Sequence, residues 1–332
     1  MKLSFLVKGS KLFFKFGFAF AIIAYMIYSD RLDLQVVKRG FSSSGTLILA
    51  TLFVVIASSL CFYRWNLLLR AQNMHFGFWP IVRYSFIGIF FSTTMPGIVS
   101  GDVIKAWYIL KDRPPGQSRT PILMSIFLDR FMGLFGLITV SVIALFFNWT
   151  HAWDTQDLKK VATTVLLLAA GMLCFFAYIM LSMWGPLAGF RRKMQKAERH
   201  SIGRLFLKVY DAWISYREAP RTLAATLVTS VFTHCFVISS VIFCAHALGE
   251  RSIPLYQYFM LVPIGLLTTA IPIAPAGLGV GHVAFAALFR IAGSNYGAEI
   301  FTLYVTLQIA LNLTGVIFYV RSPRPAVENQ IA

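Results

Sequence analysis

Two apolar stretches of this chain, one in each half of the sequence, are interrupted by proline and glycine. The first is residues 92–103 (STTMPGIVSGDV) and the second is residues 268–283 (TTAIPIAPAGLGVGHV). A helix inside a lipid bilayer that is broken in this way exposes backbone groups, which must be satisfied within protein or by a watery cavity. Paired interruptions at corresponding places in two halves indicate a transport site.

The composition excludes a soluble globular protein. Hydrophobic residues make up 58% of the 332 residues, and charged residues only 13%. Because a helix needs about 20 apolar residues to cross the ~30 Å hydrocarbon core, we predict an all-α integral membrane protein with six full transmembrane helices and two broken or re-entrant elements. The full helices are expected near residues 12–29, 46–63, 121–147, 161–182, 221–247 and 300–320, and the broken elements at 82–110 and 256–292.

The whole chain, residues 1–332, is expected to form a single membrane domain. Its first half is residues 1–160 and its second half is residues 221–320, and a basic connection, residues 183–221, joins them. This connection is shorter than the roughly 100 residues of a usual catalytic domain, so function is expected within the membrane or at its surface. The apolar run after Lys15 is long and lacks a small-residue cleavage site, which favours a retained helix.

The formal net charge of +17 is concentrated in particular connections between the apolar segments. This distribution follows the positive-inside rule and does not indicate a nucleic-acid partner. The rule places both termini and the connections near 64–83, 111–119 and 183–221 in the cytoplasm, and the connections near 148–160 and 293–299 outside. The first broken element then enters from the cytoplasm and the second from outside, an inverted arrangement in which each is either re-entrant or a pair of short crossings.

The basic connection has an amphipathic pattern of its own. Apolar residues recur at helical spacing within residues 194–217, and basic residues lie largely between them. The pattern predicts a helix on the inner leaflet. A solvated loop that sets the topology is the alternative.

The first broken element has the features of an anion site. Pro96 and Gly97 end one half-helix, and Ser100 is placed to cap the next one, ahead of Gly101 and Asp102. The free N–H groups and positive dipole end of that second half-helix are expected near the middle of the membrane. Such a terminus suits a phosphate.

The second broken element repeats part of this pattern, because residues 281–283 match residues 101–103 in two of three positions. Its interruption is formed by two prolines followed by glycines, among them Pro272, Pro275, Gly277 and Gly279. A glycine run lets the backbone approach a ligand closely. Glycines for close helix packing and prolines for kinks are the structural alternative.

Several ionisable side chains lie within the apolar stretches, where they are costly unless paired or hydrated and are therefore functional candidates. They are Arg64, Asp102, Lys105, Asp129, Arg130, His234, His282 and Arg290. Asp102 and Lys105 share one helix face, and the economical pairings are Lys105 with Asp129 or Asp102 with Arg130. The alternatives are a structural ion-pair network and, for His234, a buried hydrogen-bonding group.

The four cysteines lie within apolar segments and form no C-x-x-C pair. We therefore expect neither a disulfide framework nor a zinc site, and no cofactor.

Taken together, several of these motifs resemble the flippase-like family named for the transmembrane domain of lysylphosphatidylglycerol synthases, over about residues 45–320. The residues that carry the resemblance are Arg64-Trp65 with Leu67-Leu68, Phe90-Phe91 through Asp102 and Lys105, Asp129-Arg130 with Gly133, and Pro272 through Val280. The resemblance implies a lipid-handling domain of a bacterial cytoplasmic (inner) membrane, which moves a phospholipid or polyprenyl-linked headgroup between leaflets.

The chain departs from the family pattern where function is expected. The family usually has Gly-Gly-Asp followed by Arg, and this chain has Ser100-Gly101-Asp102 followed by Lys105. The family often has Glu after the second glycine run, where this chain has Gly281-His282, so a charge pair across the two halves is not carried over. The soluble aminoacyltransferase domain of the full-length synthases is not in this sequence, and lysyl transfer is not expected from it alone.

The sequence therefore predicts a non-enzymatic lipid flippase or scramblase. It has no G-x-x-x-x-G-K-[ST] loop, so uphill movement would need an ion gradient, with protonation of Asp102 or His282 as the coupling hypothesis. The alternatives are a lipid- or glycan-modifying membrane enzyme with Asp102, Asp129 and His282 as acid-base groups, and a non-transporting partner of a lipid-biosynthetic enzyme. The predicted substrate-binding residues are Arg64, Pro96, Gly97, Ser100, Gly101, Asp102, Lys105, Asp129, Arg130, Pro272, Pro275, Gly277, Gly279 and His282.

Overall fold

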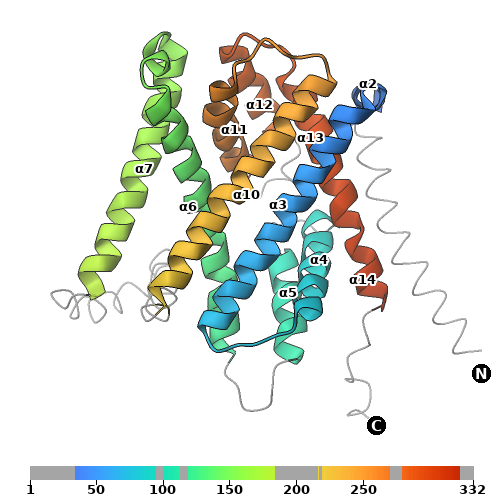
Figure 1. The fold of residues 1–332 in the computed structure, drawn as a ribbon, viewed down its shortest axis with the longest axis vertical. Helices are drawn as coiled ribbons and strands as arrows, with labels where there is room; N and C mark the ends of the chain where they lie inside the picture. The colour runs from blue at the N-terminus through green and yellow to red at the C-terminus, as the bar shows by residue number, and fades with distance from the viewer. Residues whose placement is uncertain are drawn as a thin grey trace, which may run out of the picture.

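A computed structural model describes residues 34–94, 100–112, 119–183, 216, 219–269 and 279–321. Every regular element within these ranges is a helix (Figure 1). The helices are α2 (Leu34–Ser42), α3 (Ser44–Ala71), α4 (Phe78–Thr94), α5 (Ser100–Lys111), α6 (Thr120–Phe147), the 3-10 turn η1 (His151–Trp153), α7 (Gln156–Met183), α10 (Pro220–Ala247), α11 (Leu255–Thr269), α12 (Val280–Ile291), α13 (Gly297–Leu313) and α14 (Gly315–Arg321).

Five helical stretches in the described ranges are long and apolar enough to cross a membrane. They are α3, α6, residues Gln156–Phe175 of α7, α10, and the run Gly297–Arg321 made by α13 and α14. They correspond to five of the six predicted full helices, and the sixth, residues 12–29, lies outside the described residues. Large apolar side chains such as Ile48, Leu167 and Phe146 are exposed on these helices, as expected for a surface that faces lipid.

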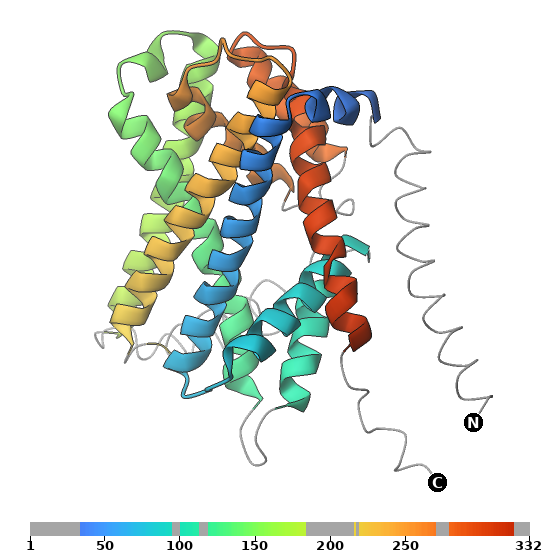
Figure 2. The ribbon, with the colours of Figure 1, turned by 45° about the vertical axis from the view of Figure 1, so that its right-hand side comes forward.

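The centre of the bundle is formed where α3, α6 and α10 meet. Helices α3 and α10 lie side by side (Figures 1 and 2) and are joined by a hydrogen bond of 2.9 Å from Ser240 Oγ to the carbonyl of Ala50. Helix α6 packs on α10 at Gly136, where a Cβ atom would overlap Ser230. This close approach brings polar residues of three long helices to one level of the bundle.

The first broken element is a hairpin of two short helices. Gly88 of α4 faces Gly101 of α5, and Tyr84 stacks on Tyr108 with ring centroids 6.3 Å apart. Because later residues of α4 meet earlier residues of α5, the two helices run antiparallel. The predicted interruption at Pro96 and Gly97 lies between them, outside the described residues.

The second broken element has the same form. Gly265 of α11 faces Phe285 of α12, and Tyr258 packs edge-on against Phe289 with ring centroids 5.6 Å apart. Residues 270–278, with Pro272, Pro275 and Gly277, lie outside the described residues. The hairpins lie in opposite halves of the bundle, α4 and α5 beside the C-terminal half of α3, and α11 and α12 beside the C-terminal half of α10 (Figures 1 and 2).

Helix α13 contacts both hairpins. At its C-terminal end, Asn312 Nδ2 donates a hydrogen bond of 2.9 Å to Thr93 Oγ1 at the end of α4. At its N-terminal end, Gly297 lies against the backbone of Phe285, and Phe301 covers Gly281, with no room for a Cβ at either glycine. Helix α13 thus fixes the two hairpins on one rigid element.

Only one residue within the predicted amphipathic helix 194–217 is described. Tyr216 is fully buried, and its hydroxyl donates a hydrogen bond of 2.9 Å to the carbonyl of Leu68. The rest of that prediction falls outside the described residues. Tyr216 itself is thus anchored against α3.

Candidate functional site

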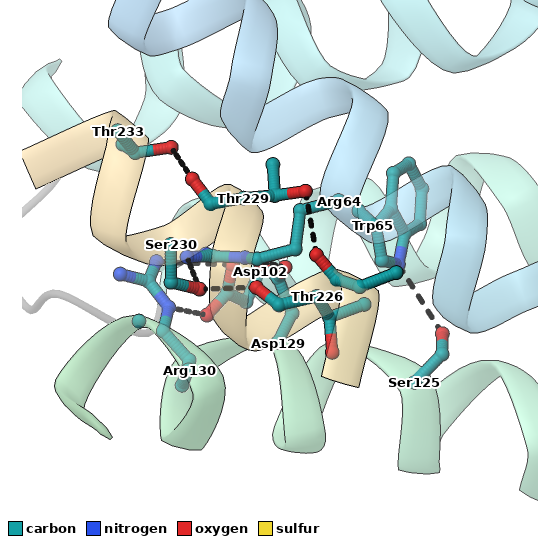
Figure 3. A network of polar contacts seen from close by, with 12 residues as sticks. Arg64, Trp65, Asp102, Ser125, Asp129, Arg130, Thr226, Thr229, Ser230 and Thr233 are labelled. Carbon is teal, nitrogen blue, oxygen red and sulfur yellow. Dashed lines mark hydrogen bonds and ion pairs between the residues drawn. The ribbon is translucent and has the colours of Figure 1, made fainter. Parts of the chain in front are cut away.

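Five charged side chains from three helices gather inside the bundle. Arg64 comes from α3, Asp102 and Lys105 from α5, and Asp129 and Arg130 from α6. Figure 3 shows four of them, with the guanidinium groups of Arg64 and Arg130 beside the carboxylates of Asp102 and Asp129. We call these five residues the charged cluster.

Arg64 and Asp129 form the buried part of the charged cluster. Nε of Arg64 donates to Oδ1 of Asp129 at 2.7 Å, and Nη1 donates to Ser230 Oγ of α10 at 3.0 Å. Gly133 lies against the guanidinium, and a Cβ there would come within 3.3 Å of Nη1. Because Arg64 is only 5% exposed, its charge must be paired and hydrogen-bonded to be tolerated, and these contacts meet that requirement.

Asp102 and Arg130 form the open part of the charged cluster. Nε and Nη2 of Arg130 donate to the two carboxylate oxygens of Asp102 at 2.8 and 3.1 Å. The Arg130 side chain is 52% exposed, whereas that of Arg64 is 7% exposed. The predicted pairing of Asp102 with Arg130 is therefore present, in a bidentate geometry that also suits a phosphate.

The other predicted pairing, between Lys105 and Asp129, is wrong. Asp129 is bound by Arg64, which reaches it from the neighbouring long helix. The ammonium of Lys105 instead lies 3.5 Å from the ring centroid of Trp65, an arrangement typical of a cation–π contact. Trp65 is itself held by a hydrogen bond of 3.2 Å from Nε1 to Ser125 Oγ.

Two cavities adjoin the charged cluster. The larger, about 560 Å³, is lined mainly by apolar residues of α6, α10 and α11, including Leu137, Val237 and Leu266. The smaller, about 250 Å³, is lined by polar side chains that include Lys105 and Gln308. The residues that line both cavities are Cys61, Arg64, Asp102 and Arg130. The ion pairs thus lie between an apolar chamber and a polar one.

His282 and Gly279 lie apart from the charged cluster, at the start of α12. The Gly279 N–H donates to His282 Nδ1 at 3.2 Å, and Nε2 lies 3.0 Å from Thr302 Oγ1. Because Nδ1 accepts a hydrogen bond from the backbone, Nε2 carries the ring hydrogen and donates to Thr302. Gly279 has a φ of +86°, which glycine adopts readily. These two predicted site residues cap a helix here.

The predicted residues Ser100 and Gly101 begin α5, and Gly101 sets the contact of this helix with α4. A Cβ at Gly101 would overlap the Gly88 carbonyl and Ser92 Oγ, so glycine allows α5 to lie directly on α4. Asp102 follows in the first turn of α5, beside Arg130. Pro96, Gly97, Pro272, Pro275 and Gly277 fall outside the described residues, and the structure does not place them.

Sequence reasoning missed most polar partners of the charged cluster. Ser230 and Thr233 on α10, and Tyr304 and Gln308 on α13, lie on or near the cavities. Their spacing of three or four residues within apolar helices was a usable signal, because it places them on one helix face. His234 was interpreted as a buried hydrogen-bonding group, and its Nε2 lies 2.9 Å from the Gly133 carbonyl. The hydrogen bond is as expected, but the side chain is half-buried and lines the larger cavity.

The comparisons with known proteins agree with the fold. The family model described as the lysylphosphatidylglycerol synthase TM region matches residues 12–317, and the chain belongs to this family. A search of curated proteins gives no match. The family membership and the apolar helices identify a multi-pass membrane protein related to lipid metabolism.

Proposed function

We propose that this member of the lysylphosphatidylglycerol synthase transmembrane family moves a lipid headgroup between the two leaflets, as a flippase or scramblase. The observation that supports the proposal best is the charged cluster with a cavity on each side. A polar headgroup needs a path with hydrogen-bonding groups, because bare hydrocarbon offers none. In this proposal the headgroup passes the cluster while the acyl chains stay in lipid.

The position of the charges within the long helices favours a functional site. Arg64 lies about two turns before the end of α3, and Asp129 about two and a half turns after the start of α6. At about 1.5 Å per residue, both are roughly 10 to 14 Å from the nearer helix end. Ionisable residues at such a depth are rare in membrane proteins unless they bind ligands, ions or one another.

The lengths of the short helices favour re-entrant elements. Helices α4 and α5 have 17 and 12 residues, and α11 and α12 have 15 and 12. At about 1.5 Å per residue they extend roughly 18 to 26 Å, less than the ~30 Å hydrocarbon core. We therefore propose that each hairpin enters and leaves the membrane on the same side, and that the two hairpins enter from opposite sides.

The charge distribution supports the α4–α5 side as cytoplasmic. The connection between α7 and α10, residues 184–219, joins two helix ends on that side (Figure 1). Its sequence contains eight Lys or Arg residues and three Asp or Glu residues. By the positive-inside rule, the proposed orientation places the α4–α5 hairpin on the cytoplasmic face of the inner membrane and the α11–α12 hairpin on the outer face.

The proposed mechanism uses the difference between the two ion pairs. The buried pair of Arg64 and Asp129 holds the helices together. The half-exposed guanidinium of Arg130 is able to exchange the Asp102 carboxylate for an anionic group of the lipid headgroup. Opening the Asp102–Arg130 pair would join the two cavities, since both residues line each of them. The headgroup would then pass from one chamber to the other.

Reconstitution of the purified protein into liposomes tests this proposal. Leaflet exchange of labelled phospholipids is measured for wild type, Asp102→Asn and protein-free vesicles, with and without a proton gradient. Asp102→Asn removes the carboxylate that Arg130 must rebind for the headgroup to be released, an interaction worth about 1.5 to 3 kcal/mol, so we expect exchange to fall by about tenfold or more. Asp157→Asn is the matched control, because Asp157 is exposed on α7 and pairs with Lys160, away from the charged cluster.

The proposal requires wild type and Asp157→Asn to accelerate exchange equally over protein-free vesicles. Asp102→Asn must elute as a folded monodisperse protein for its loss of exchange to count. Exchange no faster than in protein-free vesicles for any lipid tested, or an Asp102→Asn variant as active as wild type, would contradict the proposed function.

A further inference from the structure

The charged cluster carries an excess of positive charge. It contains three basic side chains, Arg64, Lys105 and Arg130, and two acidic ones, Asp102 and Asp129. Each acidic side chain is bound by an arginine, with nitrogen–oxygen distances of 2.7 and 2.8 Å. The formal charge left over is that of one lysine ammonium, which lines the smaller cavity.

Lys105 is the basic side chain of the charged cluster that has no acidic partner within the described residues. Among the described residues, no carboxylate lies within ion-pair distance of its ammonium, which rests over the Trp65 ring at 3.5 Å from the centroid. An aromatic face is a weaker partner for an ammonium than an oxyanion, which offers several acceptor oxygens. The stem of Lys105 is held against α4, where a Cβ at Gly88 would lie 3.2 Å from the lysine Cβ.

Ser85 supplies a second unused donor in the same cavity. Ser85 is 2% exposed, and its hydroxyl has no hydrogen-bond partner within the described part of the chain. Thr93 and Thr94 on the same helix donate to carbonyls four residues earlier at 3.0 Å, which is the usual solution for a hydroxyl on an apolar helix. The Ser85 hydroxyl makes no such bond, and Ser85 lines the cavity beside Lys105.

We infer that the smaller cavity binds the phosphate of an anionic lipid headgroup, with Lys105 and Ser85 as donors and Arg130 as the group that exchanges Asp102 for the phosphate. The inference rests on the proposed function, since it names the substrate class of the same site. A phosphate offers several acceptor oxygens to these donors and neutralises the excess charge. A headgroup with a net positive charge would meet three basic side chains, and the site disfavours it.

The binding test uses the purified full-length protein in detergent and short-chain probes. Dissociation constants are measured by calorimetry for dioctanoyl-phosphatidylglycerol, dioctanoyl-phosphatidylcholine and dioctanoylglycerol. Glycerol 3-phosphate and inorganic phosphate are added as soluble probes, because the same phosphate chemistry could come from a free anion. We expect the anionic lipid to bind about tenfold or more tightly than the zwitterionic one, and the soluble probes to bind more weakly than the anionic lipid.

Variants assign the selectivity to the named residues. Lys105→Gln should weaken phosphatidylglycerol binding about tenfold or more. It should weaken phosphatidylcholine binding less, because the loss of the phosphate contact is partly offset by the loss of repulsion between Lys105 and the choline, so the selectivity falls. Lys105→Arg should retain most of the selectivity. Ser85→Ala should weaken phosphatidylglycerol binding by a smaller factor of about threefold to tenfold. Lys160→Gln is the control, because Lys160 is 76% exposed on α7. Ser85→Ala and Lys105→Arg keep the test decisive if Lys105→Gln does not fold.

Equal affinity for the two phospholipids, or full phosphatidylglycerol affinity in both Lys105→Gln and Ser85→Ala, would overturn the inference. Inorganic phosphate that binds as tightly as the lipid would overturn the assignment to a lipid. The liposome assay separates the two proposals. Selective binding without transport would support the anionic site and contradict the proposed flippase function. Transport without preference for the anionic lipid would support the flippase function and contradict the anionic site.

Discussion

Arg64 of α3 and Asp129 of α6 are 65 positions apart in the sequence, and their side chains form a buried ion pair with Nε 2.7 Å from Oδ1. Ser230 of α10 accepts a further hydrogen bond from the same guanidinium. One side chain thus connects the three helices that form the centre of the bundle. The Asp102–Arg130 pair close by is more exposed, so the two pairs are suited to different tasks.

Removing one partner of the buried pair should destabilise the protein. Asp129→Asn leaves the Arg64 charge buried without a counter-ion, and such changes cost about 3 to 5 kcal/mol. We expect a marked fall in the thermal midpoint, measured as the loss of monodisperse protein after heating in detergent. The double variant Arg64→Met with Asp129→Leu should recover much of the loss, because apolar replacement of both partners avoids a lone buried charge.

Asp157→Asn is the control for that series, since Asp157 is 57% exposed and lies on α7. Its thermal midpoint should match wild type. An Asp129→Asn variant as stable as wild type would show that the pair does not hold the helices together.

The contact between α4 and α5 depends on a glycine. A Cβ at Gly101 would overlap the Gly88 carbonyl and Ser92 Oγ, so Gly101→Ala must move one helix away from the other. Overpacking of this kind costs about 1 to 3 kcal/mol, and the shift should also displace Asp102 from Arg130. We expect a lower thermal midpoint and slower lipid exchange in liposomes.

Gly171→Ala is the matched control for Gly101→Ala. Gly171 is an exposed position on α7 with no atom within 4 Å of the added Cβ, so alanine should leave stability unchanged or raise it by up to about 1 kcal/mol. If both variants behave alike, the close approach of α4 and α5 is not required.

The sequence predicted the helices and part of the charged cluster. Apolar length alone located five of the described membrane spans, and the depth of Asp102, Asp129 and Arg130 in apolar stretches marked them as candidates. The pairing of Asp102 with Arg130 was also predicted, because both charges needed a partner from another helix. These features follow from composition and from the cost of burying a charge.

The sequence could not predict which helix faces which. Helical periodicity places Lys105 on a face of α5, but it does not say that Arg64 of α3 reaches Asp129 first. The same limit applies to Ser230, whose role depends on the close packing at Gly136. His282 was expected at the site from its place after a glycine run, and its ring contacts the backbone N–H of Gly279 and the side-chain hydroxyl of Thr302.

Glu250 should make the connections at the α11–α12 end of the bundle sensitive to acid. It is buried after α10, where it accepts hydrogen bonds from Ser252 N and Oγ at 2.8 and 2.6 Å and from the Ser294 hydroxyl before α13. Burial raises the pKa of the Glu250 carboxyl, but these hydrogen bonds outweigh it and hold the pKa below the usual 4.5. The carboxylate therefore contributes stability above pH 4.5 that is lost as pH falls through the lowered pKa.

Glu250→Gln should reveal this contribution. At pH 7 we expect the variant to be less stable than wild type by about 1.5 to 3 kcal/mol, the worth of hydrogen bonds to a charged group. The difference in thermal midpoint should shrink below pH 4.5, where wild type loses the same interaction. Asp154→Asn, at an exposed position, should show no such pH dependence. A difference that is the same at pH 7 and at pH 4 would contradict the assignment.

Cys61 offers a direct test of water access to the charged cluster. It lines both cavities, whereas Cys244 is fully buried in the packing of α10. Two single-cysteine proteins, one that keeps Cys61 and one that keeps Cys244, are treated in liposomes with a small anionic methanethiosulfonate reagent. Such a reagent does not enter lipid, so reaction at Cys61 requires an aqueous route into the bundle.

We expect Cys61 to react in the folded protein and Cys244 to react only after denaturation. The excess positive charge beside Cys61 should also favour the anionic reagent over its cationic counterpart, after correction for their rates with a free thiol, because opposite charges attract strongly where water is scarce. Dioctanoyl-phosphatidylglycerol should slow the reaction by occupying the smaller cavity. Equal resistance of the two cysteines would mean that the cavities are closed to water, and a headgroup could then not pass the Asp102–Arg130 pair.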